Sequence, residues 1–369
     1  MVSFQPSEEQ QLIRDTVAAF ASEQVRPRAH EADEAGVIPS DVIQQGWELG
    51  LVQSAIPEAY GGSGDTRSAV TGALVAEELA WGDLSTALHL LAPRLVVYPV
   101  LEMGTPQQKE RILKAYAGAK FCAGSAAVME PRWDFDLAAL SATARGQNGS
   151  YVLNGAKCYV PLGDEAAHLL IYAATDGRED YAGVSGFLVE RDTPGLKIVE
   201  REKNMGLKGL STHEIILENC RVPAANRLGG ETGCDFAKLM NYSRVALASM
   251  AVGVARAAFE YARDYAKERK AFGVAIAQKQ TIAFMLAEMA LEIDATRLLT
   301  WEAAWKLDRG EDATREAYLA KNYASNMVLK VTDNAVQVLG GHGYIREHPV
   351  EMWARNGRGF AVFEGLAIV

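Results

Sequence analysis

Cysteine is scarce in this sequence of 369 residues, which contains only four, dispersed along the chain. Cys122, Cys158, Cys220 and Cys234 do not form the paired spacing of a metal-binding motif. They are also too few to hold a chain of this length together through disulfide bonds. We therefore expect a protein of a reducing compartment, with neither a disulfide scaffold nor a cysteine-based metal site.

Histidine motifs and positive charge are lacking as well. The six histidines form no HxH or HExxH spacing, and the chain has no GxSxG elbow and no P-loop, so none of the corresponding sites is expected. Lysine and arginine number 37 against 47 aspartates and glutamates, which gives a net charge of −10. This balance argues against a nucleic-acid or anionic-membrane partner, because either usually requires a basic face.

Long hydrophobic runs are also missing. No apolar stretch approaches the roughly 20 residues that a membrane span needs. Residues 1–11 are polar and acidic, which is not typical of a secretory signal. We expect a soluble, cytoplasmic protein without membrane insertion.

The sequence does contain enough apolar material for a large core, since 49% of its residues are hydrophobic. Residues 1–118 are predicted to form an N-terminal α-helical domain. Its first helix begins with the capping box Ser7-Glu8-Glu9-Gln10 and is expected to stop before Pro27. Further helices are expected over residues 41–51, 68–80 and 85–103, and after Thr105-Pro106.

Residues 119–228 are predicted to form a small central β domain. Asn148-Gly149 and Asn154-Gly155 both favour tight hairpin turns. Strands rich in β-branched and aromatic residues are expected over residues 151–153, 169–173, 186–189 and 214–217. Because no helices intervene, this spacing predicts an antiparallel barrel or sandwich.

Residues 229–369 return to long helical patterns. Apolar residues recur at spacings of three and four between Ile282 and Ile293. A second pattern runs from Thr314 to a stop at Gly340-Gly341. Helices of this length suit a bundle that packs against a neighbouring subunit.

Two motifs in this last domain have both an ordinary and a functional interpretation. Residues 269–273, Arg-Lys-Ala-Phe-Gly, fit a cationic helix end followed by glycine, or a guanidinium that binds a phosphate. Residues 337–344, Gln-Val-Leu-Gly-Gly-His-Gly-Tyr, fit a simple helix stop, or a loop whose backbone donors approach a ligand. Each motif alone leaves both interpretations open.

Glu364 is the candidate for acid–base chemistry. It lies in an apolar run, between residues 360–363 and residues 366–369. A carboxylate in such surroundings is either paired structurally or kept for proton transfer, and the residues alone leave the two about even.

Three motifs in a fixed order resemble the acyl-CoA dehydrogenase family: Arg-x-x-Phe-Gly at residues 269–273, Gln-x-x-Gly-Gly-x-Gly-Tyr at residues 337–344, and Phe-Glu-Gly at residues 363–365. Supporting segments at residues 153–157, 205–209 and 221–226 extend the resemblance over essentially the whole chain. The predicted order of domains is also that family's. The fold class it implies is α+β multi-domain, with an N-terminal helical domain, a central antiparallel β-barrel or sandwich and a C-terminal four-helix bundle.

The resemblance implies FAD-dependent α,β-dehydrogenation of an acyl-CoA thioester to the trans-2-enoyl thioester. Glu364 would take the α-proton while the β-hydride goes to flavin N5. A ribityl hydroxyl and the backbone N–H of the base would stabilise the charge on the thioester carbonyl. Some family members carry the base just before the position of Arg244, but Ser243 stands there and leaves Glu364 as the candidate.

Carried over by position, the resemblance implies a cofactor site shared between subunits, hence a homodimer or homotetramer. The cofactor-binding residues would be Val128, Met129, Tyr159, Val160, Pro161, Arg269, Phe272, Gln280, Gln337, Gly340 and Gly341. The substrate-binding residues would be Phe135, Asn241, Arg244, Phe363 and Gly365. No metal is expected.

Several positions depart from the family's pattern. Met129 and Phe135 replace a threonine and a serine, and Pro161 lacks the hydroxyl and the N–H of a usual threonine. Leu366 replaces another threonine, and the chain ends about one helix short of the family's common length. Three alternatives stay open: an acyl-CoA dehydrogenase, a flavoenzyme for acyl-carrier-protein thioesters, and a flavin-poor structural subunit that partners an active paralogue. The electron acceptor, an electron-transfer flavoprotein or oxygen, also stays open.

Overall fold

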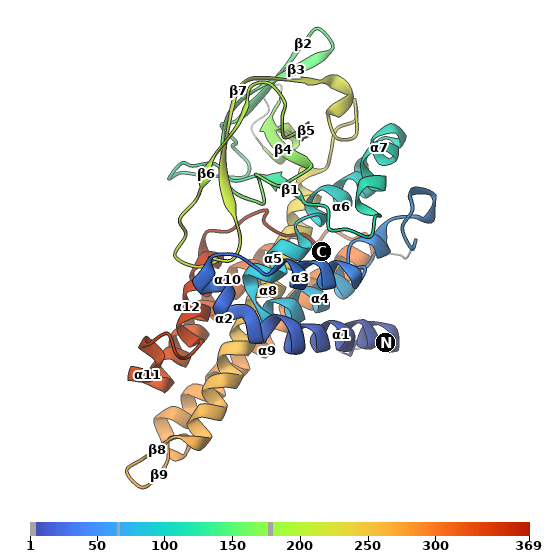
Figure 1. Ribbon diagram of the computed structural model, residues 1–369. Coiled ribbons are helices and arrows are strands. Elements are labelled where there is room, and N and C mark those ends of the chain that lie inside the picture. The colour runs from blue at the N-terminus through green and yellow to red at the C-terminus, as the bar shows by residue number, and fades with distance from the viewer. Residues whose placement is uncertain (1–4, 65–66, 176–179) are drawn as a thin grey trace.

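The computed structural model describes residues 5–64, 67–175 and 180–369 of the chain. Residues 1–4 of the polar segment at residues 1–11 therefore lie outside the described residues. The described part begins with helices, continues with a β-sheet and ends with long helices (Figure 1). The sheet lies at one end of the molecule, and the long helices extend to a small hairpin at the opposite end. This arrangement confirms the expected fold class.

The first helical region contains seven α-helices: α1 Glu8–Phe20, α2 Arg26–Ala35, α3 Ser40–Glu48, α4 Ala69–Gly82, α5 Leu84–Leu91, α6 Arg94–Met103 and α7 Pro106–Tyr116. The capping box at Ser7 forms as expected, and the helix expected after Thr105-Pro106 also begins with a capping box, formed by Thr105 and Gln108. Short 3₁₀ turns follow α3 at Gln53–Ala55 and Glu58–Tyr60.

Two helix ends differ from the prediction. The chain does not leave the helical conformation before Pro27, because a π-helical turn, Ala21–Val25, leads directly into α2 with the proline in its first turn, where its missing N–H costs nothing. The single helix expected over residues 85–103 is two helices, α5 and α6. Pro93 precedes α6 and cannot donate the hydrogen bond that would continue α5.

Seven strands form the main sheet: β1 Gly124–Ala127, β2 Thr143–Gln147, β3 Ser150–Pro161, β4 His168–Ala174, β5 Val184–Glu190, β6 Leu196–Arg201 and β7 Thr212–Pro223. Their order is β1-β4-β2-β3-β7-β6, with β5 paired to β4. Most pairs are antiparallel as expected, but β1 runs parallel to β4, and β2 meets β4 in a parallel bridge at Thr143. The sheet is therefore mixed and not purely antiparallel.

Of the two predicted turns in this region, one is confirmed. Asn148 and Gly149, both at positive φ, join β2 to β3 with Gln147 opposite Ser150. Asn154-Gly155 instead lies inside β3, where the register against β7 shifts between Leu153 and Gly155. A β-bulge uses the same conformational freedom of glycine as a turn, which is why the dipeptide was misleading.

The last region contains α8 Phe236–Glu268, the β8–β9 hairpin (Lys270–Ala271 and Val274–Ala275), α9 Gln280–Asp308, α10 Thr314–Leu339, α11 Gly341–Tyr344 and α12 Val350–Arg358. Helix α10 begins and ends where the sequence predicted. A 3₁₀ turn, Gly359–Ala361, then leads to the last residues.

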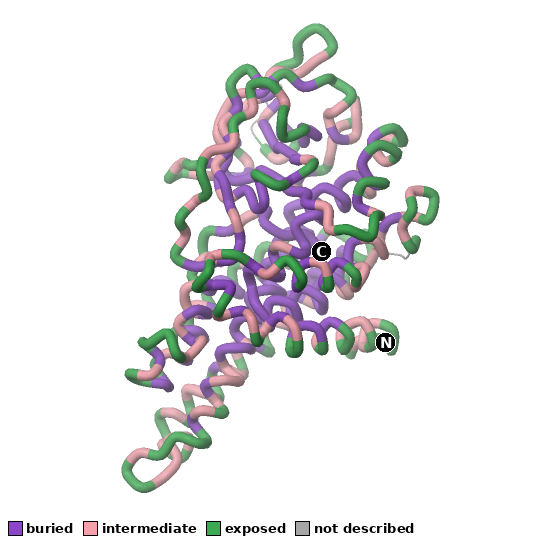
Figure 2. The backbone as a smooth tube through the Cα atoms, viewed as in Figure 1, coloured by how far each residue is buried: buried purple, intermediate pink, exposed green. Residues whose placement is uncertain are grey.

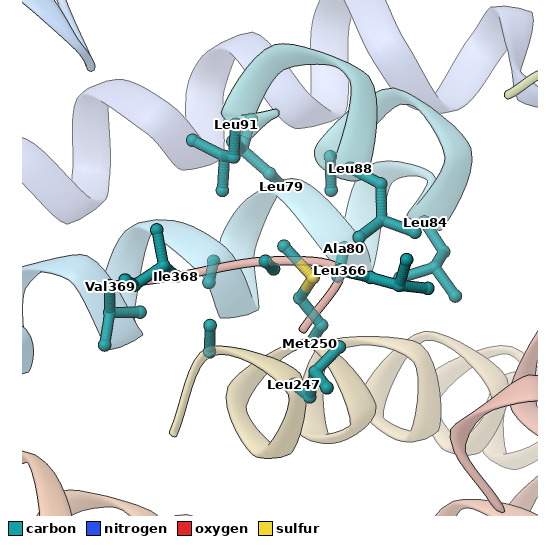
Figure 3. Packing of buried hydrophobic residues seen from close by; sticks show 14 of the residues in the cluster. Leu79, Ala80, Leu84, Leu88, Leu91, Leu247, Met250, Leu366, Ile368 and Val369 are labelled. Atoms are coloured by element: carbon teal, nitrogen blue, oxygen red, sulfur yellow. The ribbon is translucent and has the colours of Figure 1, made fainter. Parts of the chain in front are cut away.

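The main core lies where the N-terminal helices meet α8. Figure 2 shows buried backbone gathered in the middle of the molecule and an exposed tip around β8 and β9. Residues 366–369 are buried and pack between α4 and α5 on one side and α8 on the other (Figure 3). Two stretches, Leu84–Met103 and Phe236–Glu268, are long and apolar enough to cross a membrane, contrary to the expectation from sequence. However, 89% and 78% of their most apolar windows are buried inside the protein, as in core helices.

Candidate functional site

Glu364 lies where the last helical turn gives way to the buried C-terminal segment. The next residue, Gly365, has φ +70°, and a Cβ added there would stand 2.5 Å from a methyl group of Val128. Only glycine meets both conditions without strain, so the close approach of the Gly365 backbone to the Val128 side chain holds Glu364 beside the end of β1.

The carboxylate of Glu364 faces two cations. Its Oε1 lies 2.9 Å from Lys321 Nζ on α10, and its Oε2 lies 4.0 Å from Arg244 Nε on α8. The Glu364 side chain is 19% exposed, and Oε2 is buried without a hydrogen-bond partner in the part of the chain that the structure describes. The backbone N–H of Glu364 points to Met129 Sδ at 3.4 Å. Sequence reasoning missed Lys321, because a lysine in a long amphipathic helix is usually a solvated surface residue.

Arg244 and Asn241 occupy the wall of the site formed by α8. Arg244 donates to the Tyr181 hydroxyl at 3.0 Å and to Asn241 Oδ1 at 3.5 Å, while Asn241 donates to Thr314 Oγ1 at 3.0 Å. The structure thus places Arg244, a substrate-binding candidate from the resemblance, beside Glu364. Ser243 is buried, and a serine hydroxyl cannot serve as a carboxylate base.

An apolar slot lies next to Gly365. It is lined by Leu95, Pro99, Ala126, Val128, Tyr172, Leu239, Met240, Ser243, Gly365, Ala367 and Ile368. These residues come from α6, from β1 and the segment after it, from β4 and α8, and from the C-terminal segment. A slot of this composition accommodates a hydrocarbon group better than a charged one.

The aromatic candidates Phe135 and Phe363 differ in position. Phe363 is buried, and its ring centroid is 6.4 Å from that of Tyr159 in an edge-on arrangement. Phe135 is partly buried against the main core but does not line the slot.

A buried ion pair fixes the segment that carries Val128 and Met129. Lys157 of β3 donates to the carbonyl of Val128 at 2.9 Å and to Glu130 Oε1 at 3.0 Å. The Cys158 N–H donates to the Met129 carbonyl at 2.9 Å. Both backbone carbonyls of the Val128-Met129 segment are therefore held against β3.

Burial and charge oppose each other in this pair. Burial lowers the pKa of Lys157 to about 8, although Glu130 acts in the opposite direction. Burial raises the pKa of Glu130, but Lys157 and the hydrogen bonds from Ser141 and Ala142 outweigh it and leave the pKa below its usual value. Both groups are charged at neutral pH.

Tyr159, Val160 and Pro161 lie at the end of β3, close to the same site. Tyr159 has φ +52°, which is uncommon for a tyrosine, and its N–H donates to the Glu202 carboxylate at 3.1 Å. Pro161 pairs in register with Thr212 of β7, while the neighbouring Leu162 N–H reaches the Ser211 carbonyl at 2.9 Å.

The other candidate cofactor residues lie at the far end of the long helices. All six are exposed: Arg269, Phe272, Gln280, Gln337, Gly340 and Gly341. Arg269 follows α8, Phe272 forms the tip of the β8–β9 hairpin, and Gln280 begins α9. A hydrogen bond of 2.8 Å between the Tyr265 hydroxyl and His342 Nδ1 ties the end of α8 to the glycine cluster. Within one chain, the eleven candidate cofactor residues therefore form two groups. Five lie beside Glu364, and the other six, the distal group, lie where the long helices end near β8, β9 and α11 (Figure 1).

No group of three or more histidine, cysteine, aspartate or glutamate residues that could hold a metal ion occurs among the described residues, and all four cysteines are free.

Comparisons with known proteins agree with the geometry. Sequence profiles of the N-terminal, middle and C-terminal domains of acyl-CoA dehydrogenases match residues 7–120, 125–220 and 235–367. Cyclohex-1-ene-1-carbonyl-CoA dehydrogenase of Geobacter metallireducens is 39% identical over 97% of this chain and 95% of its own. The structure of butyryl-CoA dehydrogenase from Megasphaera elsdenii is similar with a TM-score of 0.89 and 31% identity, covering 98% of this chain and 96% of that one. The prolyl acyl carrier protein oxidase AnaB is similar with a TM-score of 0.86 and 29% identity, covering 97% and 96%.

Proposed function

Because the chain belongs to the acyl-CoA dehydrogenase family and is thus a flavin-dependent oxidoreductase, we propose that it converts an acyl-CoA thioester to the trans-2-enoyl thioester with Glu364 as the base. The observation that carries this role is the position of Glu364, a mostly buried carboxylate directly before Gly365, which lines an apolar slot. In this proposal the acyl group lies against the apolar residues around Gly365, and its α-carbon comes within reach of the carboxylate.

The backbone N–H of Glu364 is suited to bind the thioester carbonyl. Its present partner, Met129 Sδ, is a weak acceptor at 3.4 Å that a carbonyl oxygen readily replaces. A hydrogen bond at that oxygen stabilises the negative charge that develops as the α-proton leaves. Phe363 and Gly365 flank the base, and Arg244 and Asn241 line the approach from α8.

The residues at both ends of the molecule fit FAD. Beside Glu364, the half-buried Tyr159 offers an aromatic surface for a flat ring, while Val128, Met129, Val160 and Pro161 are buried apolar residues of the same region. In the distal group, the exposed Arg269 guanidinium has no ion pair within the described parts of the chain, and it suits a pyrophosphate. When bound, FAD accepts the β-hydride of the substrate. Met129 and Pro161 offer the ring fewer donors, so we expect weaker retention of the cofactor.

A second copy of the chain completes the cofactor site in this proposal. Arg244, beside Glu364, and Arg269, in the distal group, are 25 residues apart along α8, roughly 37 Å at 1.5 Å per residue, so we expect each group to serve a different cofactor molecule within one chain. Helix α9 also exposes large apolar residues at every seventh position: Phe284, Leu291, Leu298 and Trp305. Such a stripe suits helix packing between subunits. Light scattering should therefore give the mass of a dimer or tetramer.

The absorbance spectrum of the purified protein with FAD tests the function. We expect a flavin band that acyl-CoA bleaches in the wild type and in the matched control Glu218→Gln, an exposed carboxylate on β7. Glu364→Gln should keep the flavin and the fold but lose bleaching, because an amide cannot accept the α-proton. Bleaching retained in Glu364→Gln would place the base elsewhere, and a protein that stays colourless with FAD would contradict the proposal.

A carrier-protein thioester is the second candidate substrate. Its support is the likeness to the prolyl acyl carrier protein oxidase. A panel of acyl-CoA and acyl-carrier-protein thioesters, scored by flavin bleaching with electron-transfer flavoprotein or oxygen as acceptor, separates the two. We expect the soluble enzyme to act in the cytoplasm.

A further inference from the structure

We propose that Lys321 is a positioning residue for Glu364: its ammonium group holds the carboxylate in one place beside Gly365 before the substrate arrives. This inference rests on the proposed function of Glu364 as the base. Neither the motifs nor the resemblance pointed to Lys321, which lies in the N-terminal third of α10, 43 residues before Glu364 in the chain.

The contact is direct and largely shielded from solvent. Lys321 Nζ and Glu364 Oε1 are 2.9 Å apart, and the two side chains are 14% and 19% exposed. The second oxygen, Oε2, is buried and has no hydrogen-bond partner among the described residues. A carboxylate in such a place loses much of its hydration, so its charged form depends on the cations around it.

Lys321 is the closer of the two cations. Arg244 Nε stands 4.0 Å from Oε2, and its guanidinium is already engaged with the Tyr181 hydroxyl and Asn241. The Tyr318 ring, one turn before Lys321 on α10, lies 5.5 Å from the same guanidinium. Among the described residues, the charged and titratable groups that contact Glu364 or its nearer neighbours are therefore Lys321 and Tyr318 of α10, Arg244 of α8 and Tyr181.

The Ser325 hydroxyl links the turn of α10 that carries Lys321 to the segment just before Glu364. The Ser325 Oγ lies 2.9 Å from the carbonyl of Lys321 and 2.9 Å from the carbonyl of Phe360. Ser325 is one turn after Lys321 on α10, and Phe360 is four residues before Glu364. The backbone that carries the base is thus tied to the turn of α10 that carries its counter-ion.

This contact matters for proton transfer because it fixes where the carboxylate oxygens lie. A base must be held within hydrogen-bond reach of the proton that it takes, and a small displacement slows the reaction. Without the ammonium group, the Glu364 side chain can adopt other rotamers. Removing Lys321 should therefore lower the maximal rate.

The experiment compares Lys321→Met, which keeps length and loses charge, with Lys321→Arg, which keeps charge. We measure the maximal rate of flavin bleaching by acyl-CoA and the substrate concentration at half the maximal rate. In Lys321→Met the maximal rate should fall by about tenfold to a hundredfold, the range for a misplaced catalytic group, while the half-saturating concentration changes little. Lys321→Arg should restore most of the rate. An unchanged maximal rate in Lys321→Met, or equal losses in both variants, would overturn the proposal.

A second measurement is independent of catalysis and of flavin. Lys321→Met is expected to lower the Tm at pH 7 by about 2–4 °C. In the Glu364→Gln background, which has no charge to pair, the same change should lower it by less than half as much. Equal losses in both backgrounds would show that Lys321 is not the partner of Glu364.

The two arms also separate this inference from the proposed function. A wild-type protein that binds flavin but is bleached by no thioester contradicts the function and the rate effect that depends on it, whereas the Tm cycle still decides whether the pair exists. A Tm coupling together with an unchanged maximal rate in Lys321→Met would overturn the positioning role alone.

Discussion

Replacing Lys157 by methionine tests the buried ion pair that holds the Val128-Met129 segment. The side chains of Lys157 and Glu130 are 0% and 1% exposed. Methionine has a similar length, so the change removes a charge and two hydrogen bonds, to Val128 and Glu130, with little change in volume. The carboxylate of Glu130 would then remain in the interior without its closest cation.

The size of the expected loss in stability depends on the interactions that Glu130 keeps when Lys157 is replaced. Breaking a buried ion pair by removing one partner costs about 3–5 kcal/mol. Here Glu130 still accepts hydrogen bonds from the Ser141 N–H and hydroxyl and from the Ala142 N–H, and Arg132 Nε lies 3.2 Å from its Oε2. We therefore expect Lys157→Met to lower the free energy of unfolding by an amount at the low end, about 3 kcal/mol.

Pulse proteolysis in urea measures this loss, and a double variant checks its cause. Glu130→Gln/Lys157→Met has no buried charge at this pair, so its loss should be smaller than the sum of the two single losses. If Lys157→Met costs less than about 1 kcal/mol, the typical net value of one hydrogen bond, the pair does not stabilise this segment. Strict additivity in the double variant would refute the electrostatic reasoning in the same way.

Two further predictions concern a backbone and a pH effect. Gly365→Ala should lower the free energy of unfolding by about 2–4 kcal/mol and reduce flavin bleaching, because it combines a left-handed backbone with a clash against Val128. The control Gly50→Ala, at φ +73° with open space around it, should lower the free energy of unfolding by only about 1 kcal/mol in the same thermal unfolding assay. Equal costs would disprove the close approach. Burial lowers the pKa of His89 from 6.5 to about 4, so the unfolded chain takes up this proton first and stability falls as the pH drops from about 6.5 to 4, by up to about 3 kcal/mol. His89→Gln should flatten that part of the stability curve, and an unchanged slope would exclude His89 as its origin.

Local signals explain why most helices could be predicted from the sequence. The capping boxes at Ser7 and Thr105 and the glycine stop after Leu339 act within a few residues, so each is visible in the chain itself. The prediction was wrong where one residue type serves two structures. Pro27 starts a helix instead of ending one, and Asn154-Gly155 forms a bulge instead of a turn.

Long-range pairing could not be predicted in the same way. Strand β1, Gly-Ser-Ala-Ala, has no β-branched or aromatic residue, so its own sequence indicates neither a strand nor the parallel register with β4.

The residues of the site also differ in whether their neighbours in the chain reveal them. Glu364 stood out because its neighbours in the chain are apolar, while Lys321 and Lys157 matter through partners 43 and 27 residues away.

The altered residue Met129 takes on a different meaning in this setting. Its sulfur lies against the N–H of the proposed base, and a thioether accepts a hydrogen bond only weakly. A threonine hydroxyl at the same place would compete more strongly with a substrate carbonyl for that N–H. The substitution therefore leaves the proton-transfer side of the site, Glu364 with Lys321 and Arg244, intact. In the proposed cofactor site, Met129 provides no hydroxyl donor to the flavin. We therefore expect the substitution to lower the affinity for the cofactor more than the rate of proton transfer to Glu364.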